Sequence, residues 1–189
     1  INIADPSIIY VGQRLTIPGT GGGGSNSGST PNAPANDPPR RPAPAAGPGS
    51  ILAKKRIVTY YGNPYTGAMG VLGRYDPETV VAKLKEQVAV YAALSDKPVQ
   101  GGLHFITPTA QANPGPDGMY RARMPMSLIE QYADLANRHG LLFFLDLQVG
   151  RSTVQAEVTT LLPLLDRPYV HLALDPEFDM WGDQEPGQQ

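Results

Sequence analysis

From residue 54 onward, apolar residues recur with two alternating periods, the two-residue period of strands and the 3.6-residue period of helices. Between the short apolar runs lie longer amphipathic segments that predict three helices. The expected strands are 56–61, 99–107, 141–148 and one that begins at 170 and ends at Pro176. The expected helices run from an Asp76 cap to Ser95, from a Ser127 cap to His139, and from Ser152 or Thr153 to Leu165 unless Pro163 ends the last one earlier.

The last predicted strand has the clearest alternation of the four. One of its faces is apolar, which suits packing under a helix, whereas the other is small and then acidic. Pro176 cannot donate a backbone hydrogen bond, so we expect regular strand pairing to end there. The apolar face consists of Val170, Leu172 and Leu174, and the other face consists of His171, Ala173, Asp175 and Glu177.

The order of elements predicts an α/β fold with a parallel sheet. Strands and helices alternate as β-α-β-α-β-α-β, and each connection is long enough for a right-handed crossover. About four such units make half of a (β/α)8 barrel, so we expect residues 53–189 to form the N-terminal half of a barrel. A doubly wound nucleotide-binding domain is less favoured, because no G-x-G-x-x-G or Walker pattern follows any strand. No cofactor is therefore expected.

The composition separates a linker from the rest of the chain and excludes several classes of partner and site. Residues 20–52 are rich in Gly, Ser, Pro and Ala, which predicts a disordered linker or tether. The formal net charge of −2 gives no reason to expect nucleic acid as a partner. Cysteine is absent, which excludes disulfides and thiolate zinc sites. No apolar run approaches the roughly 18 residues of a membrane-spanning helix.

Residues 1–19 combine two turn signals with a short alternating strand that Pro18-Gly19 ends. Their pattern N-x-x-x-P-x-x-I-Y-x-G-Q-x-L-x-I-P resembles the C-terminal half of a LysM domain. The resemblance implies a partial module that binds the N-acetylglucosamine backbone of peptidoglycan or chitin. By the same resemblance, the sugar contacts would come from Pro6, Ile8, Ile9 and Tyr10. The alternative is a short hairpin without a ligand.

On a parallel barrel the carboxyl ends of all strands meet at one face, where ligands and catalytic groups lie. The predicted strands bring polar and aromatic side chains to that face, with Trp181 in the loop beyond as a candidate for stacking on a sugar ring. Two carboxyl groups with separated pKa values are what hydrolysis of a glycosidic bond requires. The candidate residues are Tyr61, Asn63, His104, Asp146, Gln148, Asp175 and Glu177.

The Asp175-Pro176-Glu177 ending of the fourth strand resembles the acidic motif of glycoside-hydrolase barrels. That resemblance implies that Glu177 is the general acid, with Asp175 or Asp146 as its partner carboxylate. Residues 56–187 also resemble a largely uncharacterised family of secreted bacterial proteins, through the L-A-L-D-P-E strand ending and the Y-G-N-P end of the first strand. This second resemblance implies a barrel-like domain and no particular activity.

Two interpretations of these acids remain open. In the first, the chain is part of an exported bacterial cell-wall protein that binds peptidoglycan or a chitin-like glycan and hydrolyses it. In the second, it is a non-catalytic wall or spore-coat protein, and the acids belong to a structural network with Arg151, His104 or His171. No His-x-His or H-E-x-x-H spacing occurs, so no metal is expected. We read the chain as a fragment of a longer precursor, with the signal sequence outside it.

Overall fold

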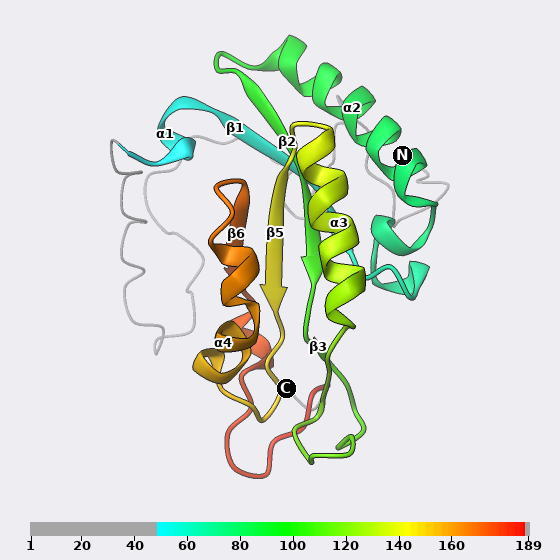
Figure 1. Cartoon of the computed structure of the whole chain (residues 1–189), viewed down its shortest axis with the longest axis vertical. Helices are drawn as coiled ribbons and strands as arrows, with labels where there is room; N and C mark the ends of the chain where they lie inside the picture. Colours follow the sequence, from blue (N-terminus) through cyan, green and yellow to red (C-terminus); the bar gives the residue numbers. More distant parts are fainter. Residues whose placement is uncertain (1–48, 188–189) are drawn as a thin grey trace, which may run out of the picture. The chain divides into compact units, whose positions relative to one another are not determined.

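A computed structural model describes residues 49–187 of the chain (Figure 1). The predicted LysM fragment 1–19, with its proposed sugar contacts Pro6, Ile8, Ile9 and Tyr10, lies outside the described residues. So does most of the predicted linker. The short helix α1 (Ile51–Lys54) begins inside the range expected to be linker, and the side chain of Ser50 caps it by accepting a hydrogen bond from the Leu52 amide.

The centre of the described residues is a four-stranded sheet in the order β1-β2-β5-β6, with every neighbouring pair parallel. This confirms the predicted parallel α/β architecture. The order in the sheet follows the order in the sequence, so each crossover leads to the adjacent strand. Two-residue strands β3 and β4 pair antiparallel within the long loop after β2. The strands are β1 Arg56–Gly62, β2 Val99–Ile106, β3 Thr109–Ala110, β4 Arg121–Ala122, β5 Leu142–Leu147 and β6 Val170–Leu174.

Three longer helices connect the main strands, and most of their predicted caps are present. Asp76 caps the first by accepting from the Thr79 amide, and Thr153 caps the last by accepting from the Ala156 amide. None of the helices within residues 49–187 is long and apolar enough to cross a membrane. The helices are α2 Pro77–Leu94, α3 Met126–Arg138 and α4 Val154–Leu165, and short 3-10 turns cover Gly67–Met69 (η1), Val71–Gly73 (η2) and Pro176–Phe178 (η3).

One predicted helix cap is wrong, because a proline takes its place. Ser127 does not cap α3, because the helix already begins at Met126 with the extended Pro125 in the cap position. The predicted end of the last helix near Leu165 is confirmed, and Pro163 does not end α4 earlier. The fixed φ of proline is compatible with a helix, and only two residues of the helix remain after it.

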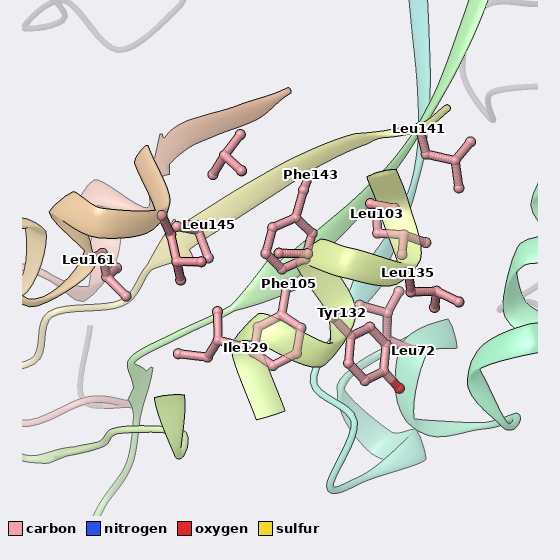
Figure 2. Close-up of a cluster of buried hydrophobic side chains, with 14 of the residues drawn as sticks. Leu72, Leu103, Phe105, Ile129, Tyr132, Leu135, Leu141, Phe143, Leu145 and Leu161 are labelled. Carbon is pink, nitrogen blue, oxygen red and sulfur yellow. The ribbon is translucent and has the colours of Figure 1, made fainter. Parts of the chain in front are cut away.

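All three longer helices pack on the same face of the sheet. The register aligns Leu103 with Phe143 and Val170, and Phe105 with Leu145, so these side chains form one continuous apolar surface. Figure 2 shows residues of α3 such as Ile129 and Tyr132 packed over Phe105. Because one face of the sheet takes all the helices, the fold is singly wound, unlike a nucleotide-binding domain that has helices on both faces.

The apolar face of β6 is only partly buried, contrary to the expectation that it packs under a helix. Val170 is buried, but Leu172 and Leu174 are 40% and 49% exposed. The reason is position, since β6 is the last strand of the sheet and α4 packs toward the core through Leu161 and Leu164.

Candidate functional site

The face of the sheet opposite the helices carries a row of four rings. Tyr61, His104, Phe144 and His171 lie in register on β1, β2, β5 and β6. Consecutive ring centroids are 5.1, 5.5 and 5.2 Å apart, distances at which aromatic rings attract one another. The row forms the floor beneath the polar groups that gather at the carboxyl ends of the strands.

Above this row, three side chains from three strand ends form a closed hydrogen-bonded ring. Asp175 lies just after β6, and its Oδ2 accepts hydrogen bonds from the Tyr61 hydroxyl at 3.3 Å and from Gln148 Nε2 at 3.0 Å. Gln148 Nε2 also donates to the Tyr61 oxygen at 3.3 Å, and its Oε1 accepts from the Ala110 amide. The structure therefore brings together residues 61, 148 and 175, which sequence reasoning placed at the same barrel face.

The surroundings of Asp175 favour its protonated form. Burial is the main cause that raises the pKa of this carboxyl, and the neighbouring carboxylates Asp146 and Glu177 raise it further, against the hydrogen bonds from Gln148 and Tyr61. Burial also raises the pKa of the Tyr61 hydroxyl, and Asp175 adds to that effect. Tyr61 is therefore a neutral hydrogen-bond donor over the whole physiological pH range.

A second acid lies deeper, on β5 itself. Asp146 is 1% exposed, and its Oδ2 is 3.1 Å from Nε2 of His104 on the adjacent strand. The contact has the distance of an ion pair but not the angle of a hydrogen bond, and Asp146 Oδ1 has no hydrogen-bond partner among residues 49–187. Buried polar atoms are nearly always paired, so this acid is unusual in the fold.

Asn63 arrives at the same end of the sheet but is occupied by backbone contacts. Its Nδ2 donates to the Ile106 carbonyl and to Thr109 Oγ1, both at 3.2 Å, and its Oδ1 accepts from the Tyr65 amide at 2.9 Å. Asn63 is 2% exposed. In this structure it fastens the loop after β1 to the end of β2, so its role here is to shape the site.

Glu177 and Trp181 lie outside the hydrogen-bonded ring. Glu177 belongs to the turn η3 and is exposed, because the strand has already ended at Leu174 and the two-residue alternation no longer holds there. Trp181 is 74% exposed and follows Met180, whose amide donates to the Gly150 carbonyl just beyond β5. This contact keeps the tryptophan segment at the carboxyl end of the sheet.

Sequence reasoning missed one exposed aromatic side chain in this region. Tyr65 follows β1 and is 64% exposed, and its position is set by the bond between its amide and Asn63. The aromatic residue immediately after the Gly-Asn-Pro turn was the available signal. Exposed aromatic rings are common in sites that bind sugars, because the ring packs against the C–H face of the sugar.

Neither a metal site nor an enclosed pocket explains the acids. Within residues 49–187, no three His, Asp or Glu side chains are placed to hold a metal ion. The ring of Phe144 separates the two histidines of the row. A groove of about 750 Å³ lies at the opposite ends of β1 and β2, lined mainly by apolar residues including Leu52, Tyr91 and Leu94. It contains none of the predicted site residues, so we place the candidate site at the carboxyl ends of the strands on chemical grounds.

Comparison with known proteins gives no independent guide to this site. No protein-family model matches the chain, and neither a curated protein nor a solved structure is significantly similar to it.

Proposed function

We propose that residues 49–187 form the first four units of a (β/α)8-type barrel that acts on a cell-wall glycan. Two features of the fold support a barrel over an open sheet. The strands follow one another in sequence order, and all three longer helices lie on one face. In a barrel the opposite face is the interior, which would enclose the row of rings and place Asp175 at the mouth.

The observation that carries the proposal is the hydrogen-bonded ring of Tyr61, Gln148 and Asp175. Both of its bonds to Asp175 reach Oδ2, which leaves Oδ1 to carry the transferable proton. A carboxyl group that is held in place, is partly buried and has a raised pKa has the properties of the general acid in glycoside hydrolysis. We therefore assign the acid to Asp175.

Glu177 is the partner carboxylate in this proposal. It is exposed and lies two residues beyond the acid, where its carboxylate would activate water or stabilise positive charge on the sugar. This exchanges the roles predicted for the two acids from the sequence. Tyr65 and Trp181 would provide flat apolar surfaces for the sugar rings on either side.

The glycan proposed is peptidoglycan or a chitin-like polymer, and the support for it is the LysM-like pattern of residues 1–19. A wall-binding module tethered to the barrel would raise the local concentration of the polymer at the site. Export to the cell wall follows from this choice of substrate and is part of the same proposal.

The test is the release of reducing ends from purified peptidoglycan by the full-length protein that contains the chain, and by its Asp175→Asn and Glu177→Gln variants. We expect release by the unmodified protein and a loss of at least about 100-fold in Asp175→Asn, which is the range that general acid catalysis contributes. Pelleting with peptidoglycan should be unchanged in both variants. Pelleting without any release would instead favour the non-catalytic wall or spore-coat protein. Loss of release in Glu177→Gln alone would return the acid to Glu177.

A further inference from the structure

Three segments that are distant in the sequence meet beyond the carboxyl ends of the strands (Figure 1). They are the end of the long loop before β4, the residues shortly after β5, and the segment that follows η3. The first contributes Tyr120, the second contributes Arg151, and the third carries the exposed Trp181. The contacts among the three segments determine where this tryptophan lies.

Arg151 contacts both of the other segments. Its guanidinium carbon lies 4.2 Å from the centroid of the Tyr120 ring, within the range of a cation–π interaction. Its Nε donates a hydrogen bond of 2.9 Å to the backbone carbonyl of Gln184. The Tyr120 hydroxyl in turn donates to Glu185 Oε1 at 2.7 Å. The segment after η3 is therefore fastened at two successive residues.

Gln184 connects this fastening to Trp181. The Oε1 atom of Gln184 accepts a hydrogen bond from the Trp181 amide at 3.1 Å, and the amide of Gln184 donates to the Trp181 carbonyl at 3.2 Å. Both backbone polar groups of Trp181 are therefore bonded to one residue, whose own carbonyl is bonded to Arg151. The tryptophan remains 74% exposed, so an open aromatic ring stands on a backbone that is held in place.

The backbone of Tyr120 is in a conformation that its surroundings must enforce. Its φ is 53°, and it is the only residue other than glycine with a positive φ among residues 49–187. Such residues persist where neighbouring contacts fix them, and they are frequent in ligand-binding sites. The neighbouring contact here is the segment after β5. The Arg151 amide donates to the Met119 carbonyl at 2.8 Å, and a Cβ at Gly150 would collide with the same oxygen.

We propose that Arg151 is a positioning residue that fixes Trp181, through Gln184, as a preformed platform for a sugar ring. The inference rests on the proposed function for the identity of the ligand. A ring that is already fixed loses less conformational freedom when a ligand binds, so its fixation favours affinity. Arginine suits this role because its planar guanidinium can stack on Tyr120 while its Nε donates to Gln184.

The experiment uses the fluorescence of Trp181, which is the only tryptophan of the chain. The time-resolved anisotropy of this fluorescence is measured in the full chain, in Arg151→Gln and in Gln184→Ala. Gln184 is exposed, so its substitution should leave the fold intact. We expect the fast component of the anisotropy decay, which reports local motion of the ring, to increase in both variants. Arg151→Lys should not restore the wild-type decay, because lysine keeps the charge but not the planar group.

A matched control is Arg167→Gln. Arg167 also contacts an acid and a tyrosine, since its Nη1 donates to Asp134 Oδ1 at 2.8 Å and to the Tyr169 hydroxyl at 3.2 Å. It precedes β6, at the opposite end of the strand from Trp181. We expect no change in the anisotropy decay of this variant.

The second measurement is a fluorescence titration of the same proteins with chitotetraose, a soluble oligomer of N-acetylglucosamine. We expect the wild-type fluorescence to respond to the sugar. In Arg151→Gln the dissociation constant should rise about 3- to 10-fold, the range expected when one more side chain must be ordered on binding. Residues 1–19 contain no tryptophan, so sugar bound there does not contribute to the signal.

An unchanged anisotropy decay in Arg151→Gln, or an equal change in Arg167→Gln, would overturn the inference. Greater mobility of the ring with an unchanged dissociation constant would also overturn it, because the positioning would then have no effect on binding. If the wild-type fluorescence does not respond to chitotetraose, the sugar platform and the proposed substrate are both wrong. The anisotropy decay needs no sugar, so it still decides whether Arg151 fixes Trp181.

Discussion

Two acids of this domain, Glu157 and Asp146, are equally buried at 1% exposure but differ in the number of hydrogen-bond and charged partners around them. Glu157 on α4 accepts hydrogen bonds from Arg121 and Arg123 at 2.8 Å and also from the Ser152 hydroxyl. Asp146 on β5 has one histidine contact and an oxygen without a partner.

The difference distinguishes an acid that stabilises the fold from one whose charge acts on the candidate site. The Glu157 cluster joins the strand β4 and the loop after it to the start of α4, and both carboxylate oxygens of Glu157 accept hydrogen bonds. Asp146 keeps part of its charge uncompensated, and that charge faces Asp175 and Tyr61. Charge that is buried without full compensation is costly and is found mainly where it serves function. Four predictions test this contrast.

The largest expected effect is on stability when the Glu157 cluster is broken. Glu157→Gln removes the charge between two arginines, and the buried Arg121 would keep only its pair with the half-exposed Asp117, at 2.9 Å. We expect the free energy of unfolding to fall by about 3–5 kcal/mol, as for other buried ion pairs that lose one partner. Urea denaturation measures this loss. In the control Glu78→Gln, where the pair with Arg138 is exposed, the loss should be below about 1 kcal/mol. Equal losses in both variants would contradict the contrast.

The second prediction concerns the pH dependence of stability, which should have opposite signs for the contributions of Glu157 and Asp175. Burial alone would raise the pKa of Glu157, but the hydrogen bonds from Arg123, Ser152 and Arg121 outweigh it and lower this pKa. The stability that Glu157 contributes is therefore present above the ordinary glutamate pKa of about 4.3 and is lost as the pH falls through the lowered value.

For Asp175 the pKa is raised, so ionisation costs stability as the pH rises from the ordinary aspartate value of about 3.9 through the raised one. Urea denaturation between about pH 3 and 7 should show the wild type losing its advantage over Glu157→Gln toward low pH. The free energy of unfolding of Asp175→Asn should increase relative to that of the wild type as the pH rises. The same pH trend in both pairs would show that one of the two assignments has the wrong sign.

The third prediction is that Asp146→Asn has little effect on stability. The lost contact with His104 is offset by removal of a buried charge that was only half compensated. We expect a change within about 1 kcal/mol in urea denaturation, far smaller than for Glu157→Gln. A loss comparable to that of Glu157→Gln would mean that Asp146 is a structural acid.

The smallest effect is expected for Tyr61→Phe, which removes one hydrogen bond from the ring around Asp175. A net loss of about 0.5–1.5 kcal/mol is typical for one such bond. Because the tyrosine hydroxyl favours the ionised form of Asp175, its removal should raise the pKa of that carboxyl further. An NMR titration of the Asp175 carboxyl group measures this pKa. Tyr65→Phe is the matched control, because no hydrogen bond joins the Tyr65 hydroxyl to the Tyr61–Gln148–Asp175 ring among residues 49–187.

Local patterns in the sequence were sufficient to predict the order of strands and helices in residues 53–187 and their parallel pairing. Asp76 and Thr153 were recognisable as caps because capping depends on side chains a few residues apart. The gathering of Tyr61, Gln148 and Asp175 could also be predicted, because parallel strands end at the same edge. These predictions succeed because each one depends on short-range geometry or on a rule that holds for all parallel sheets.

The tertiary structure alone decided how each acid is used. In the sequence, Asp175 and Glu177 occupy equivalent positions of one predicted strand. The strand ends at Leu174, however, and the turn that follows exposes Glu177. Asp175 instead accepts hydrogen bonds from Tyr61 and Gln148. Likewise, the basic partners of the two buried acids are distant in the chain. His104 is 42 residues from Asp146, and Arg121 and Arg123 are 36 and 34 residues from Glu157. Burial and the electrostatic environment depend on such distant partners, so they emerge only when the chain is folded.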